Sequence, residues 1–270
     1  MSKRRFFKRA ARKMLFSDWI TEIFAFVVIG AFFVGVTHFG TSVAITLNEL
    51  TKNLLFAGAV VNFFDLLALA LVIPMIYGLF YFEINAVSNE KGVLSDLFYA
   101  FSDKTLLGRC YGLFLRIFIR GILCYLPAIA LFWLRMFYFE SNLFGILSIG
   151  NVDVISFVLN TVFVLLLYLG FVLLSGTFVG IFVTVKREDL SVDECFFVAG
   201  KCIRKNRFEL AKLSLSFLPL FVISLFSIGF LFVIYTLPYM LITFVLYSKY
   251  FYEKLNLEAQ AEIGLAVSQN

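Results

Sequence analysis

The run from Leu210 to Tyr252 constrains this chain more than any other segment. It is predominantly apolar over its whole length, with the tripeptide Ser227-Ile228-Gly229 near its middle. A helix that crosses a bilayer needs about 20 residues, so this run is long enough for two spans. We therefore expect a membrane hairpin that turns at residues 227–229.

Four other apolar runs precede this hairpin. The 270 residues are 61% hydrophobic and 15% charged, whereas a soluble domain is about 45–50% apolar and about 25% charged. The composition excludes a water-soluble domain and predicts an all-α, polytopic helical membrane protein with six transmembrane helices in three hairpins, accompanied by cytoplasmic amphipathic helices. The predicted spans are 19–39, 54–84, 106–134, 154–185, 210–226 and 230–252. They make up one membrane domain, 19–252, which is followed by a polar C-terminal tail, 253–270.

Residues 1–18 are predicted to form a basic amphipathic helix. Its apolar positions recur at helical spacing, at Phe6, Phe7, Ala10, Ala11 and Met14. A helix of this kind lies on an anionic membrane surface. A signal peptide or an organelle transit peptide also begins with basic residues. The long amphipathic stretch and the spans that follow favour an N-terminus that is retained in the cytoplasm.

A second amphipathic helix is predicted after the fourth span. Ser191 and Glu194 have the spacing of a capping box. The residues that follow place an apolar face on this helix, at Val192, Cys195, Phe196, Ala199 and Ile203. A shorter helix is predicted to be capped by Ser95, with its apolar side at Leu97, Phe98 and Phe101. Gly176 and Gly180, within the fourth span, form a GxxxG step that allows close helix approach.

The basic residues of the two amphipathic helices are the candidate contacts with anionic lipid headgroups. They are Arg4, Arg5, Lys8, Arg9, Arg12, Lys13, Lys201, Arg204, Lys205 and Arg207. Because the basic residues of the chain lie between apolar runs, we expect the lipid bilayer as the partner and no nucleic acid. The sequence identifies no protein partner.

The distribution of basic residues predicts the orientation. Of the 23 Lys and Arg residues, all but Lys52 and Arg135 fall in segments that a six-span chain places on one side. Basic residues accumulate on the cytoplasmic side of a membrane. Both termini are therefore expected in the cytoplasm.

Asp65 and Arg120 form a candidate intramembrane polar pair. Each lies about 11 residues into its span, which at about 1.5 Å per residue is roughly 16 Å from its own membrane surface. In a core of about 30 Å both would lie near the midplane, where an unpaired charge is costly. We expect the two charges to meet, whereas Arg109 and Arg116 reach the interface as snorkelling side chains.

No motif for catalysis, metal binding or a cofactor is present. The chain has one histidine, His38, and four cysteines without a CxxC pair. The seven-residue spacing of Cys195 and Cys202 is typical of packing on one helix face. We therefore expect no enzyme activity, no metal and no cofactor.

The second half of the chain resembles an uncharacterised bacterial integral-membrane family, known as domain of unknown function 975. The likeness rests on Ser191-Val192-Asp193-Glu194, Lys205-Asn206-Arg207-Phe208, Ser227-Ile228-Gly229-Phe230, Tyr235-Thr236-Leu237-Pro238-Tyr239 and Phe251-Tyr252-Glu253. The family is distantly similar to the membrane domain of some glycerophosphodiester phosphodiesterases. The resemblance implies six spans and a bacterial plasma membrane, and it brings no catalytic residue.

These observations favour a non-enzymatic membrane protein, either a scaffold or a lipid-interacting factor. The alternative is a small transporter or permease component with a polar path near Asn62, Asp65 and Arg120. A water-filled cavity around Asp65 would favour transport. A lipid-active enzyme comes third, because no catalytic constellation supports it.

Overall fold

The computed structural model describes residues 3–88, 92–140, 152–204, 206–226 and 230–268, and every regular element in these ranges is helical. The first half contains α1 (Lys3–Ser17), α2 (Trp19–Thr51), α3 (Leu54–Val87), the 3₁₀ helix η1 (Leu94–Phe101) and α4 (Lys104–Glu140). The second half contains α5 (Val152–Ser175), α6 (Thr177–Lys186), α7 (Val192–Arg204), α8 (Arg207–Leu215), α9 (Leu218–Phe226), the π-helical turn η2 (Phe232–Thr236) and α10 (Leu237–Ser268). The all-α prediction is confirmed for these residues.

Five described segments are long and apolar enough to cross a membrane. They are Trp19–Thr51, Leu54–Val87, Lys104–Leu134, Phe157–Lys186 and Phe232–Leu257. They coincide with five of the six predicted spans, and their composition indicates a membrane-embedded protein.

The predicted span 210–226 differs from the other five because it is divided into two short helices. Helices α8 and α9 have nine residues each, well below the length that a single span requires. Pro219 accounts for the break, since its ring lacks an N–H and clashes with the carbonyl four residues earlier. That carbonyl belongs to Leu215, where α8 ends. The turn predicted at 227–229 lies outside the described residues.

Helix α2 continues to Thr51, whereas the sequence predicts a polar loop over residues 40–53 between the first two spans. The hydroxyls of Thr41, Ser42, Thr46 and Thr51 each donate to the carbonyl four residues earlier, so these polar side chains are satisfied within the helix. The connection shrinks to residues 52–53. Lys52 adopts a left-handed conformation with φ of 54°. The Asn53 side chain then accepts a hydrogen bond from the Phe56 N–H at 3.1 Å, which caps α3.

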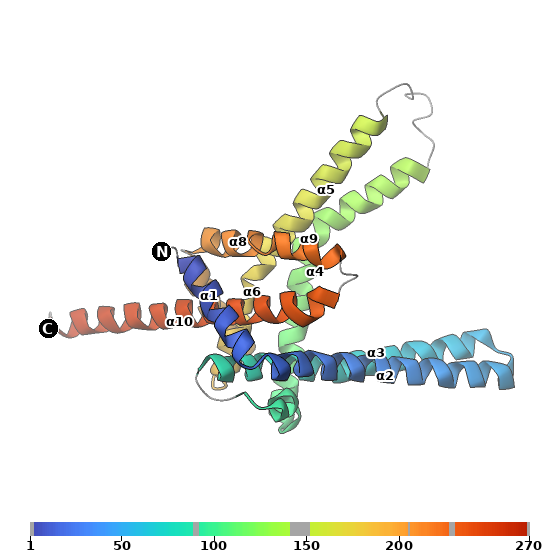
Figure 1. The fold of residues 1–270 in the computed structure, drawn as a ribbon, viewed down its shortest axis with the longest axis horizontal. Helices are drawn as coiled ribbons and strands as arrows, with labels where there is room; N and C mark the ends of the chain where they lie inside the picture. Colours follow the sequence, from blue (N-terminus) through green and yellow to red (C-terminus); the bar gives the residue numbers. More distant parts are fainter. Residues whose placement is uncertain (1–2, 89–91, 141–151, 205, 227–229, 269–270) are drawn as a thin grey trace.

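The two hairpins α2–α3 and α4–α5 project from the centre of the molecule in different directions (Figure 1). Their outer halves are covered by exposed apolar side chains, such as Val34 at 61%, Leu55 at 87% and Leu123 at 64% exposure. An apolar surface of this extent needs a lipid environment. The arms are therefore the parts of the fold that a bilayer would surround.

The core lies where the inner ends of these arms meet α1, α6, α7 and α10. Its largest buried side chains include Phe82, Phe217, Phe244 and Tyr247. The rings of Phe178 and Phe244 stack at a centroid distance of 4.4 Å and join α6 to α10. Aromatic rings therefore hold the centre of the protein together.

Helix α1 packs on the protein through the apolar face that we expected to face lipid. Phe7, Ala11 and Leu15 are buried, and the ring of Phe7 lies 4.6 Å from that of Tyr247 in α10. The Tyr239 hydroxyl donates to the Lys8 carbonyl at 3.3 Å. Phe6 remains on the surface of α1, at 59% exposure.

The predicted short helix is present as η1, but the predicted cap is wrong, because Ser95 lies inside the helix and Val93 precedes its first turn. Its first turn is closed by the carboxylate of Asp96, which accepts a hydrogen bond from the Val93 N–H at 3.2 Å. The helix lies against Gly78 of α3, where a Cβ would be 2.2 Å from the Leu97 carbonyl oxygen. Gly78 thus permits the backbone of η1 to approach α3.

The tail predicted at 253–270 is a continuation of α10, which is described as helical to Ser268. Pro238 lies near the start of α10, where its missing N–H is tolerated. The π-helical turn η2 lies directly before it. A local π-helical turn can give a new partner to the backbone carbonyl that loses its donor at a proline.

Candidate functional site

Helices α6 and α7 form a tight unit at the inner end of the fourth span. The capping box predicted at Ser191 is confirmed, because the Glu194 carboxylate accepts from the Ser191 N–H and hydroxyl at 2.8 Å each, while the Glu194 N–H donates to the Ser191 hydroxyl at 3.3 Å. The predicted apolar face of α7 is buried at Cys195, Phe196 and Ala199. A Cβ at Gly180 would lie 2.7 Å from the Phe196 ring, so Gly180 permits close approach of α7.

Arg109 of α4 fixes the loop between α6 and α7. Its guanidinium donates to the carbonyls of Thr184 at 2.8 Å, Arg187 at 2.5 Å and Glu188 at 3.1 Å, and also to that of Leu190. The last carbonyls of a helix lack intrahelical partners and carry partial negative charge. A guanidinium offers five donors in a fixed fork, so one side chain satisfies the end of α6 and orders the loop. Arg109 therefore has a packing role in place of the predicted snorkelling.

The same loop is held from the side of η1. The Tyr99 hydroxyl donates to the Glu188 carboxylate at 2.6 Å, and the Tyr99 ring stacks on that of Tyr81 at a centroid distance of 3.8 Å. Burial and the Glu188 carboxylate raise the pKa of Tyr99. The hydroxyl therefore stays protonated at neutral pH and keeps donating to Glu188.

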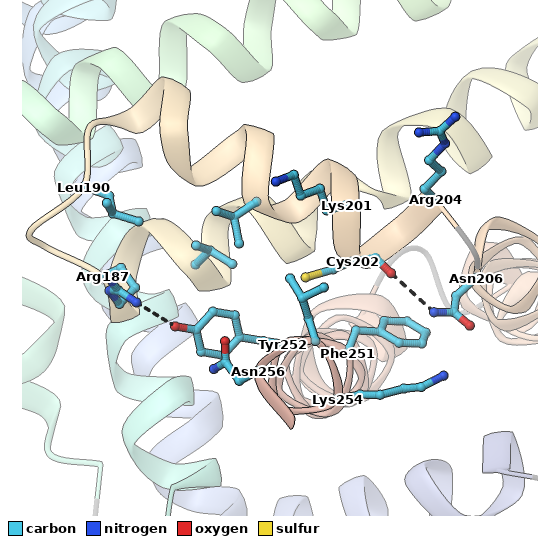
Figure 2. A pocket seen from close by; sticks show the side chains of 13 residues that line it. Arg187, Leu190, Lys201, Cys202, Arg204, Asn206, Phe251, Tyr252, Lys254 and Asn256 are labelled. Atoms are coloured by element: carbon cyan, nitrogen blue, oxygen red, sulfur yellow. Dashed lines mark hydrogen bonds between the residues drawn. The ribbon is translucent and has the colours of Figure 1, made fainter. Parts of the chain in front are cut away.

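A groove of about 570 Å³ lies between this unit and the C-terminal half of α10. Figure 2 shows the side chains that line it, which come from α6, the loop, α7 and α10, together with Asn206 directly before α8. Four of them are basic, namely Arg187, Lys201, Arg204 and Lys254. The apolar lining consists of Val183, Leu190, Val198, Phe251 and Leu255. The groove thus joins an apolar floor to a ring of positive charge.

The basic side chains differ in their environments. Arg187 donates to both oxygens of Asp189 at 2.8 Å and to the Tyr252 hydroxyl at 3.3 Å, which raises the pKa of Arg187 and keeps it charged. The Lys201 ammonium lies 4.6 Å from the centroid of the Phe197 ring, and Arg204 is exposed. Because Asp189 neutralises Arg187, Lys201 and Arg204 are better placed to meet an anion.

The described lining of the groove offers hydrogen-bond donors and positive charge. It contains no Asp, Glu or His among those residues. Burial raises the pKa of the Cys202 thiol to about 11, so this thiol is protonated at neutral pH and is a poor nucleophile. The Asn206 amide donates to the Cys202 carbonyl at 3.3 Å. The arrangement fits binding of an anionic, partly apolar molecule.

The described residues among the predicted lipid contacts separate into three groups. Lys201 and Arg204 line the groove, and the side chains of Arg5, Arg9, Arg12 and Lys13 are exposed on α1. Arg4 and Lys8 instead turn toward α8, where they donate to the carbonyls of Lys212 at 3.4 Å and Ser216 at 2.9 Å. Lys205 and the side chain of Arg207 lie outside the described residues.

The structure does not bring Asp65 and Arg120 together. Both side chains are exposed, and the two ion pairs found among the described residues are Arg116–Asp193 and Arg187–Asp189. Equal depth along consecutive helices fails as a guide here, because α3 and α4 belong to arms that diverge (Figure 1). Arg120 lines a smaller cavity of about 220 Å³ with Gly176 and Phe196, and Asp65 is not part of it.

Sequence reasoning missed Arg187, Lys254 and the part played by Arg109. Arg187 and Lys254 stand beside acidic residues at the ends of apolar runs. Their position at the end of two spans is the signal that could have identified them.

Comparison with known proteins gives no relative of this chain. No protein-family model matches, and neither the curated proteins nor the solved structures contain a match. The family resemblance of residues 190–253 therefore stays a prediction.

Proposed function

We propose that this protein is a non-enzymatic, lipid-interacting membrane protein that binds the headgroup of an anionic phospholipid in the groove between α6, α7 and α10. The observation that carries the proposal is the combination of Lys201 and Arg204 with an apolar floor in one groove. A phosphate pairs with the basic side chains, and the glycerol and upper acyl chains of the same lipid meet the apolar residues.

The position of the groove along the spans supports this ligand. Arg187 directly follows the candidate span that ends at Lys186, and Lys254 lies near the end of the one that finishes at Leu257. Residues at the ends of spans lie at the level of the lipid headgroups. A lipid could therefore enter the groove sideways while it remains in the bilayer.

The wider arrangement that we propose has six spans, with the broken pair α8–α9 as the fifth. The N-terminus and the C-terminus are both cytoplasmic, the membrane is the plasma membrane of a bacterium, and the protein belongs to the family that residues 190–253 resemble. The excess of basic residues on one side supports this orientation. Under it the groove opens toward the cytoplasmic leaflet, where anionic lipids attract basic side chains.

The decisive experiment compares two charge reversals in the full chain. Arg204→Glu changes a groove residue, and Lys52→Glu makes a charge change of the same sign at the distant α2–α3 connection. Purified protein in a neutral detergent is titrated with phosphatidylglycerol or phosphatidylcholine, and the shift in thermal midpoint is recorded. One basic contact contributes up to about 1 kcal/mol, so Arg204→Glu should lower the apparent affinity for phosphatidylglycerol, read from the titration, about fivefold or more. Lys52→Glu should leave this affinity unchanged.

Two results would contradict the proposal. Equal weakening by both reversals would mean that the lipid responds to net charge alone. Phosphatidylcholine is zwitterionic, whereas phosphatidylglycerol carries a net negative charge. An equal response to both lipids would mean that the groove does not select an anionic lipid.

A further inference from the structure

Two carboxyl side chains are buried together at the base of the first hairpin. Glu22 stands in the first turn of α2 and is 3% exposed, and Glu83 stands near the end of α3 and is fully buried. Neither oxygen of Glu83, nor the Oε2 of Glu22, has a hydrogen-bond partner among the described residues.

Both side chains face a cavity of about 370 Å³ at the junction of α1, α2, α3 and α10. Oxygen-bearing side chains make up the rest of its polar lining, which is contributed by Ser17, Asp18 and Thr21. No Lys or Arg is found among the described residues that line it. The nearby ammonium of Lys249 is directed to the Val87 carbonyl at 3.2 Å.

A buried carboxylate without a partner is unstable unless something neutralises it. Glu83 gains no help from its own helix, because the C-terminal end of a helix carries partial negative charge. A proton shared by the two carboxyls would need no space around it. The polar side chains of the adjoining cavity present oxygen atoms that can act as metal ligands, so the cavity fits a bound cation instead.

We propose that Glu22 and Glu83 bind one divalent cation of the Ca²⁺ or Mg²⁺ class in this cavity, which the hydroxyls of Ser17 and Thr21 also line. Two ionised carboxylates balance a charge of +2, which leaves the buried site neutral. Hard divalent cations take oxygen ligands and retain water where the protein supplies few. The cation would tie the α1–α2 junction to the end of α3, and it is independent of the lipid groove.

The experiment uses the full chain in a neutral detergent without anionic lipid, so that lipid phosphates cannot hold the ion. Thermal unfolding is measured in EDTA and after addition of Ca²⁺, Mg²⁺ or Na⁺. Binding of Mn²⁺ as a spectroscopic probe is followed by electron paramagnetic resonance. The variants are Glu22→Gln and Glu83→Gln, and the matched control is Glu49→Gln, an exposed residue at the far end of α2.

We expect Ca²⁺ or Mg²⁺ to raise the thermal midpoint of the wild type and of Glu49→Gln, and one Mn²⁺ to bind per chain. Glu22→Gln and Glu83→Gln should lose both responses. In EDTA, Glu83→Gln should be at least as stable as the wild type, because the neutral amide removes the repulsion between the carboxyls, and this outcome shows that the variant folds.

Three results would overturn the assignment. Unchanged Mn²⁺ binding by Glu83→Gln would place the ion elsewhere, and a response to Na⁺ equal to that to Ca²⁺ would exclude a divalent site. A wild type that ignores every cation but gains stability as pH falls from 7 to 5, when Glu83→Gln does not, would show that the pair holds a proton.

Discussion

The guanidinium of Arg109 donates to the backbone carbonyl of Thr184 at 2.8 Å, which joins the start of α4 to the last turn of α6. The same group reaches three more carbonyls in the loop that follows. One side chain therefore holds the loop that leads into α7 and that contributes Arg187 and Leu190 to the basic groove.

Replacing Arg109 should strongly destabilise the protein. Three of the four bonds that Arg109 donates are partly buried, and a buried acceptor that loses its donor costs about 1–3 kcal/mol. We therefore expect Arg109→Met to lower the free energy of unfolding by about 3 kcal/mol or more. Arg109→Lys keeps the charge but offers three donors from one point. Its stability should therefore lie between that of the wild type and that of Arg109→Met. Thermal unfolding in detergent measures the effect. Arg120→Met, at an exposed site on the same helix, is the control, and an equal loss there would refute the role given to Arg109.

Two glycines of α3 should respond to alanine in opposite directions. At Gly78 a Cβ would collide with the Leu97 carbonyl oxygen, whereas at Gly58 nothing lies within 4 Å. Overpacking costs about 1–3 kcal/mol, so Gly78→Ala should lower stability by about 2 kcal/mol. Gly58→Ala should raise it by up to about 1 kcal/mol, because alanine favours a helix. Unfolding midpoints of the two variants check this, and a stabilising Gly78→Ala would show that η1 does not pack closely on α3.

Lys8 gives stability a dependence on alkaline pH. Burial, with a smaller effect of Arg4, lowers the pKa of Lys8 from 10.5 to about 8. Between these values the unfolded chain binds a proton that the folded chain lacks, so stability rises with pH across this window. From pH 8 to pH 10, the free energy of unfolding of the wild type should therefore rise relative to that of Lys8→Met, by roughly 1 kcal/mol after allowance for solvent screening.

Unfolding midpoints of the wild type and Lys8→Met across this pH range test the prediction. Lys13→Met removes an exposed ammonium from the same helix and should not reproduce the trend. A difference between wild type and Lys8→Met that stays flat would place the Lys8 ammonium in solvent.

Local patterns in the sequence were sufficient for the elements of the site. Ser191 and Glu194 act within a single helical turn, and the apolar face of α7 follows from spacing alone. The basic face of α1 was predicted too, but only in part. Arg4 and Lys8 turn toward carbonyls of α8, 208 residues further along the chain, and no local pattern records such a partner.

Predictions that depended on the relative placement of helices were less successful. Asp65 and Arg120 were matched by depth, which assumes parallel spans, and the arms that carry them diverge. The segment 40–53 is predicted as a loop because it is polar, and hydroxyl side chains supply much of that polarity. In the structure those hydroxyls bond to carbonyls of their own helix, so a polar composition does not end α2.

The docking of α1 on α10 has a consequence for the order in which the chain is made. The carbonyl of Lys8 and the hydroxyl of Tyr239 are 231 residues apart, so α1 leaves the ribosome well before α10 and receives its partner only after the helices between them have been synthesised. Until then the side chains of Phe7 and Leu15 need another apolar surface. A basic amphipathic helix finds one at an anionic membrane. During biogenesis α1 would therefore bind the membrane surface first and leave it to pack on α10 once α10 has been synthesised.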